Sequence, residues 1–161
     1  MLHEVAAAYM QSLKQTETYR NMWNSTTEKL LLGKLLEIAH TYPNIGWKVD
    51  RFEAVGNLES IGLIFPDGPS GLTDRSTGIL KPLEKKGGKL IFGQMYNGKI
   101  AVVLSFPLIE GATQPLENKI LDHVTPDEIT PAFIEKQVEA FLEELKEWET
   151  GEERNLIGYR K

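Results

Sequence analysis

The stretch from Lys89 to Phe106 constrains the fold of this chain more than any other part of the sequence. Two strand-like runs lie on either side of Asn97-Gly98, and in each run apolar residues occupy both alternating faces. Asn-Gly is the strongest short-range hairpin signal, because a type I′ turn needs positive φ at both central residues. We therefore predict a hairpin at the centre of a sheet that is covered at least partly on each side. Its expected core residues are Phe92, Val102 and Leu104.

A second hairpin is predicted before this one. Alternating apolar residues indicate strands over Trp47–Val55 and Leu58–Phe65, and Gly56-Asn57 between them is typical of a turn. The alternation changes phase near Asp50-Arg51, which indicates a bulge. Residues 45–106 are therefore expected to form an antiparallel, four-stranded meander.

Three helices are predicted around this sheet. A narrow apolar stripe indicates a helix over about the first 20 residues, which we expect either to lie across the outside of the fold or to form a dimer seam. Ser25–Glu28 is a capping-box sequence that starts a second helix, and Pro43 ends it. Thr130-Pro131 starts the third, with Gly151 as its stop. The first stripe consists of Leu2, Val5, Ala6, Tyr9 and Leu13.

Residues 66–88 are rich in Gly, Pro and polar side chains, and we interpret them as a long loop, functional or mobile. Residues 107–122 also lack a regular pattern. The predicted class is α+β, with a four-stranded antiparallel meander, two N-terminal helices and one C-terminal helix packed mainly on one face. A single domain is expected over residues 1–161. Its parts are the helical segment 1–43, the sheet 45–106 with loop 66–88, the C-terminal helix 125–150 and the tail 151–161.

Composition excludes several classes of function. The net charge of −5 argues against a nucleic-acid partner, which would require a basic surface. The absence of cysteine excludes disulfides, thiolate metal sites and a cysteine nucleophile. The longest apolar run, over residues 100–109, is too short for a bilayer span, and the first residues do not resemble a signal peptide. We expect a cytoplasmic protein with no membrane partner, no cofactor and no metal.

The candidate binding residues lie in the 66–88 loop and near the C-terminus. Loops on a rigid scaffold often carry function, although the same polar side chains occur in any exposed loop. Large apolar side chains near the C-terminus are suited to an interface, unless the tail folds back on its own sheet. The loop candidates are Asp67, Asp74, Arg75 and Lys81, and the C-terminal candidates are Trp148 and Tyr159.

No catalytic motif accompanies these candidates. Gly68–Gly71 is not a nucleophile elbow, and Gly87-Gly88-Lys89 lacks the upstream glycine of a phosphate-binding loop, so we interpret it as a flexible hinge. We therefore predict a binding or adaptor domain that acts by protein–protein interaction, with a protein partner or a homo-oligomer. The alternative is a small enzyme in which loop 66–88 is an active-site lid.

Overall fold

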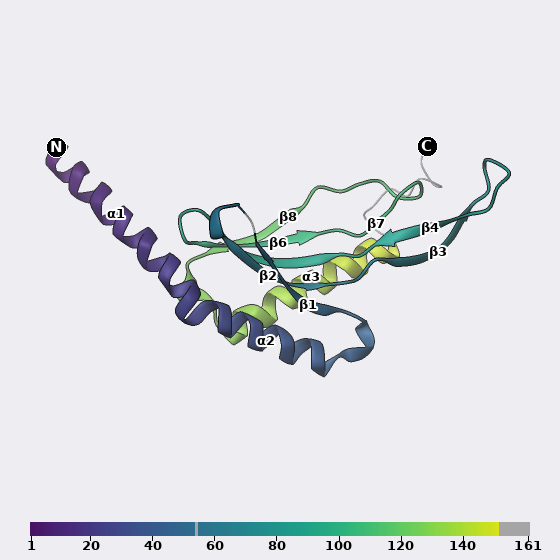
Figure 1. Ribbon diagram of the computed structural model, residues 1–161, viewed down its shortest axis with the longest axis horizontal. Helices are drawn as coiled ribbons and strands as arrows, with labels where there is room; N and C mark the ends of the chain where they lie inside the picture. The colour runs from purple at the N-terminus through teal and green to yellow at the C-terminus, as the bar shows by residue number, and fades with distance from the viewer. Residues whose placement is uncertain (54, 152–161) are drawn as a thin grey trace.

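The computed structural model describes residues 1–53 and 55–151, and it confirms the α+β class. Helices lie at both ends of the chain, with antiparallel strands between them (Figure 1). The predicted four-stranded meander is wrong. The described residues form eight strands, divided between a five-stranded and a three-stranded sheet.

The larger sheet has the strand order β1-β2-β5-β6-β8, so the predicted central hairpin does supply its central strand. Strands β1 and β2 pair in continuous register, and the bulge predicted near Asp50-Arg51 is therefore wrong. Strand β8 begins within residues 107–122, the stretch expected to be irregular. The bounds are β1 (Lys48–Glu53), β2 (Glu59–Ile64), β5 (Lys89–Gln94), β6 (Ile100–Ser105) and β8 (Lys119–Val124).

The smaller sheet replaces the predicted 66–88 loop. Strands β3 (Gly68–Asp74) and β4 (Lys81–Lys86) form a hairpin, and β7 (Leu108–Ile109) pairs with the end of β4. This hairpin, which we call the β3–β4 arm, extends from the molecule at the end opposite α1 (Figure 1). A hairpin explains how so long a polar segment can be ordered, since its backbone groups pair with each other.

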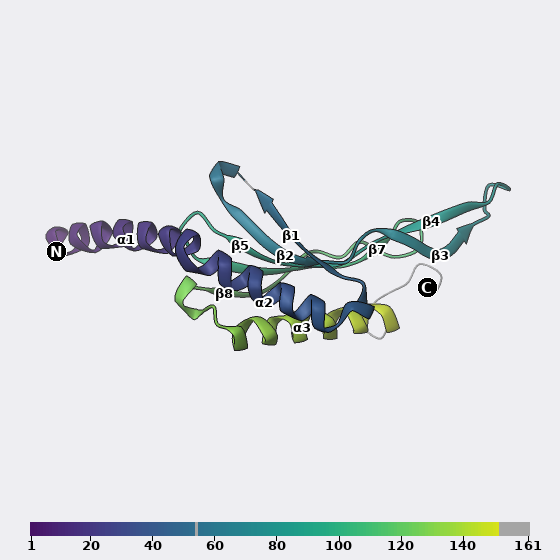
Figure 2. The ribbon, with the colours of Figure 1, turned by 60° about the horizontal axis from the view of Figure 1, so that its bottom comes forward.

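The core lies between the larger sheet and two helices. Helices α2 (Glu28–Thr41) and α3 (Pro131–Thr150) cover the same face of the sheet (Figure 2). The opposite face, with Ile91 and Val103, is half-buried. Thr130 and Gly151 cap α3 as predicted. The Thr130 hydroxyl accepts a hydrogen bond from the Phe133 amide at 3.1 Å, and Gly151 ends the helix with a left-handed φ of 72°. The predicted core residues Phe92, Val102 and Leu104 are all fully buried.

The two N-terminal helices are joined without a break. Helix α1 (Leu2–Met22) continues through a π-helical turn, η1 (Trp23–Thr27), into α2. The capping box predicted at Ser25–Glu28 is therefore wrong, because the chain is already helical there. The Thr26 hydroxyl instead donates back to the Met22 carbonyl at 3.1 Å. Shorter 3-10 turns are η2 (Pro43–Ile45) and η4 (Pro126–Glu128). The segment η3 (Val55–Asn57) is a turn in which Gly56 and Asn57 have positive φ, at 65° and 67°.

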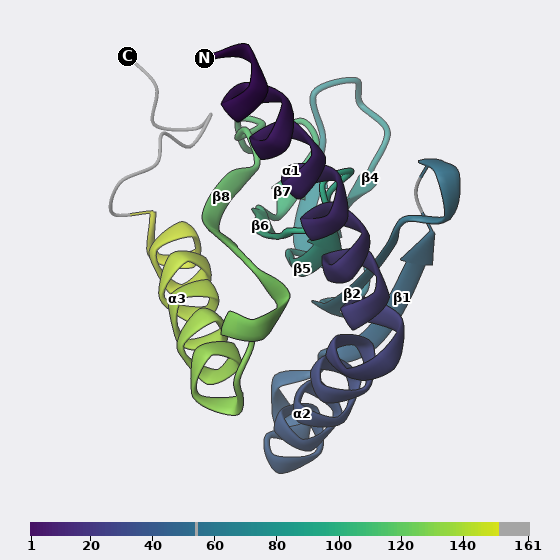
Figure 3. The same cartoon turned by 90° about the vertical axis from the view of Figure 1, so that its left-hand side faces the viewer.

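Helix α1 is attached to the body only near its C-terminal end. The Arg20 guanidinium donates to the Tyr96 carbonyl in the β5–β6 turn, and Trp23, directly after the helix, is fully buried. Helix α1 itself contains no buried residue, and most of its length projects away from the sheets (Figures 1 and 2). Figure 3 views the molecule from this end, with α1 in front of the sheets. None of the helices in the described part of the chain is long and apolar enough to cross a bilayer.

The β5–β6 turn differs in type from the prediction. Gly98 has the predicted positive φ, at 84°, but Asn97 does not, so the turn is not type I′. The Gly98 amide donates to the Met95 carbonyl at 2.9 Å, and the Met95 amide to the Lys99 carbonyl at 2.8 Å. These bonds define a three-residue loop that ends in a left-handed glycine.

Replacing Gly98 with asparagine is expected to destabilise the protein, although asparagine tolerates positive φ. A Cβ atom at this position would lie 2.5 Å from the Tyr19 Cβ and 3.0 Å from the Thr16 carbonyl of α1. Gly78→Asn is the matched control, because Gly78 has a similar φ of 81° and its Cβ would meet nothing within 4 Å. In urea unfolding, Gly98→Asn should lose about 1 to 3 kcal/mol more than the control. Equal losses would contradict the packing of α1 on the turn.

Candidate binding pocket between the arm and helix α3

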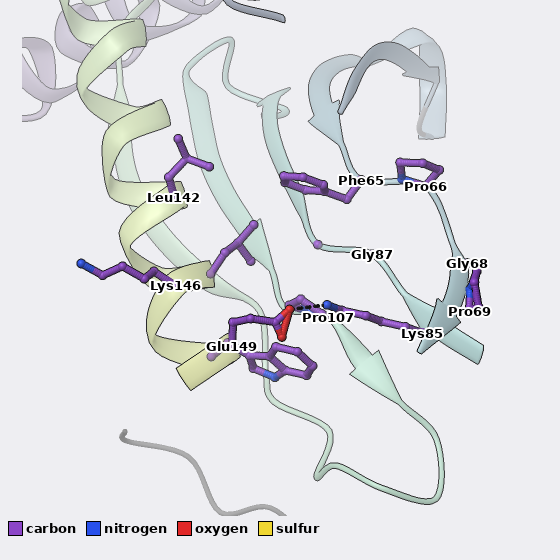
Figure 4. Close-up of a pocket in the computed structure, with 13 residues that line it drawn as sticks. Phe65, Pro66, Gly68, Pro69, Lys85, Gly87, Pro107, Leu142, Lys146 and Glu149 are labelled. Atoms are coloured by element: carbon purple, nitrogen blue, oxygen red, sulfur yellow. Dashed lines mark hydrogen bonds and ion pairs between the residues drawn. The ribbon is translucent and has the colours of Figure 1, made fainter. Parts of the chain in front are cut away.

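A pocket of about 370 Å³ lies between the base of the β3–β4 arm and the C-terminal half of α3 (Figure 4). This volume falls at the lower end of the range of ligand sites, about 300 to 1,000 Å³. The lining is mainly apolar, with charged side chains at its rim. The apolar lining residues include Phe65, Pro69, Pro107, Leu142, Leu145 and Trp148, and the charged ones among the described residues are Lys85, Lys146 and Glu149.

One wall of the pocket is continuous with the hydrophobic core. The Phe65 ring lies 5.9 Å from the Trp47 ring and 6.0 Å from the Phe141 ring, centroid to centroid. Phe141 is fully buried, and Trp148 is only 5% exposed. Because Phe141 belongs to the core and Phe65 packs against it, this wall of the pocket is preformed.

Lys85 connects the arm to helix α3. Its ammonium group lies 2.6 Å from the Glu149 carboxylate, as Figure 4 shows, and 5.1 Å from the centroid of the Trp148 ring. The Glu149 side chain is 62% exposed, so solvent screens the ion pair, and its contribution to stability is small. The main effect of the two contacts is to fix the position of the Lys85 charge at the rim.

Two glycines lie beneath the pocket, where two backbone segments approach closely. The Phe65 amide donates to the Gly88 carbonyl at 2.9 Å, and the Gly87 amide donates to the Asp67 carboxylate at 3.1 Å. A Cβ at Gly87 would lie 2.0 Å from the Phe65 carbonyl oxygen, and one at Gly88 would lie 2.9 Å from Leu145 Cδ2. Gly87 is therefore required for the close approach of the two backbones, whereas at Gly88 the nearest atom is the end of the Leu145 side chain. The predicted flexible hinge does not describe the role of Gly87.

The predicted binding residues do not gather at one place. Trp148 lines the pocket. Asp67 lies beside the pocket, because its carboxylate accepts a hydrogen bond from the amide of the lining residue Gly87. Asp74 and Lys81 are opposite one another where β3 and β4 meet their connecting turn, and Arg75 is in that turn. Tyr159 lies outside the described residues.

Asp74 has a structural role in the turn of the arm. Its carboxylate accepts the Ser76 amide at 2.9 Å. This bond, a further one from the Ser76 side chain, and to a smaller degree the charge of Lys81, hold the pKa of Asp74 below its usual value. Asp74 is thus stabilised as an anion that shapes the turn.

Sequence reasoning did not identify Lys85, Leu142, Leu145 and Glu149 as pocket residues. Lys85 belongs to a lysine-rich stretch that is typical of a solvated turn. The leucines extend the apolar stripe of α3 towards its C-terminal end, which indicates burial but does not show what lies opposite. The pocket can be recognised only in the folded structure, where β4 lies next to the C-terminal half of α3.

The chemistry available in the pocket is that of binding an apolar group next to fixed charges. The part of the chain that the structure describes has no group of three or more His, Asp or Glu side chains placed to hold a metal ion. Comparison with known protein families, curated proteins and solved structures finds no match to this chain.

Proposed function

We propose that this chain is a binding domain of the adaptor type, which holds a short segment of a partner protein in the pocket between the β3–β4 arm and α3. The observation that carries the proposal is the apolar pocket, which has a preformed wall continuous with the core and charged side chains at its rim. Sites of this kind bind an anchoring side chain in the apolar hollow and orient it through a few polar contacts.

The charges at the rim indicate the chemistry of the bound segment. Among the described residues, the charged side chains that line the pocket are two lysines and one glutamate, so its rim presents two ammonium groups to a bound segment. Lys85 is held by Glu149, whereas the Lys146 side chain is 68% exposed and pairs with Glu143 one helical turn away, at 3.2 Å. A large aliphatic or aromatic side chain with an Asp or Glu beside it would match both features.

The alternative of a small enzyme with a lid receives less support. A lid must move over convergent polar groups. Residues 66–88 form a paired hairpin, and Asp74, Arg75 and Lys81 lie towards its tip, away from the pocket at its base. The binding function is therefore the one that we put forward for testing.

Gly68→Phe is expected to block the pocket. Gly68 pairs directly with Lys85, and opposite residues in antiparallel strands have side chains on the same face. The new ring would therefore point towards α3, as Lys85 does, and its Cβ would meet no atom within 4 Å. A random peptide library displayed on phage should yield peptides that share an apolar position next to an acidic one. Their affinity for Gly68→Phe should be lower by about tenfold or more.

Glu84→Phe is the matched control, because Glu84 is adjacent to Lys85 in β4 and its side chain points to the opposite face. This variant should bind the selected peptides as the unmodified chain does, and thermal unfolding should show that both variants are folded. Failure to select any common peptide pattern would overturn the proposal. Equal affinity of Gly68→Phe and the unmodified chain for the selected peptides would overturn it as well.

A further inference from the structure

The free part of helix α1 exposes an apolar stripe to solvent. Four of its side chains are exposed by 81% (Leu2), 58% (Val5), 62% (Tyr9) and 48% (Leu13). An isolated helix of this length is marginal in water, and helices in proteins are stabilised mainly by packing of an apolar face. The stripe is therefore a surface that lacks its packing partner within the described part of the chain.

The uncovered part of the apolar stripe, within residues 2–15, carries no charged side chain. Over residues 2–15 the sequence contains two charged residues, Glu4 and Lys14. With a rotation of about 100° per residue, both are on the side of the helix away from the stripe. The positions that flank the stripe are Met10 on one side and Ser12 on the other, both uncharged, and Thr16 follows it along the helix. A partner surface must therefore be apolar and uncharged, because a charge placed against this face would lose its hydration without gaining a counter-charge.

The same face of α1 contacts the body where the helix reaches it. Thr16 and Arg20 continue the stripe towards Trp23, and at this end the helix packs on the β5–β6 turn and the core. The body thus covers only the C-terminal part of a continuous face. A second element lying along the remaining part would extend a contact that already exists.

We propose that the uncovered face of α1 pairs with the same face of α1 from a second copy of this chain, in an antiparallel arrangement centred near Tyr9. Self-pairing satisfies the requirement for an uncharged partner, because both faces are the same neutral stripe. The antiparallel direction follows from the shape of the molecule. Helix α1 projects from one end (Figure 2), so antiparallel copies place their bodies at opposite ends of the helix pair, whereas parallel copies would bring them together.

Pairing about Tyr9 also matches the sizes of the side chains. Val5 and Leu13 are each four residues from Tyr9, so Val5 of one copy lies beside Leu13 of the other. Ala6 and Ser12 are each three residues away, and these small side chains allow the two backbones to approach closely. The arrangement also places the helix dipoles in opposite directions, which is favourable.

Tyr9→Glu is expected to weaken this self-association. Two carboxylates would face each other at the centre of the pair, so the dissociation constant of the dimer, measured by analytical ultracentrifugation over a concentration series, should rise by about tenfold or more. Gln11→Glu is the matched control, with the same change of charge on the outer side of the helix, and should leave the dimer unchanged. A chain that is monomeric throughout the series, or equal effects of the two variants, would overturn the proposal.

Single cysteines test the orientation, because the natural chain has none. In the antiparallel pair, Tyr9→Cys places two thiols at the centre, within the Cα separation of about 4.4 to 6.8 Å that a disulfide needs. The two Leu2 positions would be about 21 Å apart along the axis, so Leu2→Cys should not cross-link. Efficient cross-linking of Leu2→Cys would indicate a parallel pair and overturn the arrangement.

This inference is independent of the proposed function. The pocket is lined by residues of the β3–β4 arm and the C-terminal half of α3, which lie away from the projecting end of α1 (Figure 1), so Tyr9→Glu should retain the affinity of the unmodified chain for the selected peptides. In turn, Gly68→Phe should retain the dimer. Each proposal can thus fail without the other.

Discussion

Truncation of Leu104 to alanine is expected to lower the free energy of unfolding by about 2 to 5 kcal/mol. Leu104 is fully buried in β6, in the hydrophobic core formed by the larger sheet with α2 and α3. The substitution removes apolar contacts and leaves a cavity that close-packed neighbours fill only in part. Urea unfolding monitored by tryptophan fluorescence provides the measurement.

Leu36→Ala is the control for this prediction. Leu36 lies in α2 and is 50% exposed, and alanine is a better helix former than leucine, so the change in free energy should stay within about 0.5 kcal/mol of zero. Similar losses for the two substitutions would show that the β5–β6 hairpin is not at the centre of the core.

Gly87→Ala is expected to cost about 3 kcal/mol or more, at the upper end of the range for overpacking. The added Cβ would lie 2.0 Å from the Phe65 carbonyl oxygen and 2.6 Å from its carbonyl carbon. These are backbone atoms, so the segment that connects the two sheets must move. The bond from the Gly87 amide to Asp67 is expected to be lost with this movement.

Gly68→Ala provides the comparison, because Gly68 is also in the smaller sheet and its Cβ would meet nothing within 4 Å. Its midpoint in thermal unfolding should remain close to that of the unmodified chain, whereas the midpoint of Gly87→Ala should fall by several degrees. If Gly87→Ala unfolds at the same temperature as Gly68→Ala, the close approach beneath the pocket is not present in solution.

The parts of the fold that were predicted correctly are those with a strong local pattern. The stripe of α3 and its caps at Thr130 and Gly151 are local signals, and the structure has all of them. The hairpin at Asn97-Gly98 was located correctly although its turn type was wrong. Turn type depends on the twist of the flanking strands and on contacts from α1, which no short stretch of sequence encodes.

The β3–β4 arm was missed because its strands lack the usual pattern. Their sequences contain Gly68, Pro69, Gly71 and Pro82, residue types that are depleted in strands, and no strand residue of the arm is fully buried. Strand β8 was missed because charged residues interrupt its apolar ones. The pocket could not be predicted for a related reason: it forms between β4 and α3, whose pocket residues Lys85 and Glu149 are 64 positions apart in the chain.

The charges on β1 have a consequence for how this protein behaves when it is concentrated. Strand β1 is at one edge of the larger sheet, where unpaired backbone groups invite strands of other molecules to add on. Four of its six residues are charged: Lys48, Asp50, Arg51 and Glu53. Charged side chains on an edge strand oppose the growth of sheets between molecules. Samples that are kept at high concentration should therefore resist forming amyloid-like fibres through this edge.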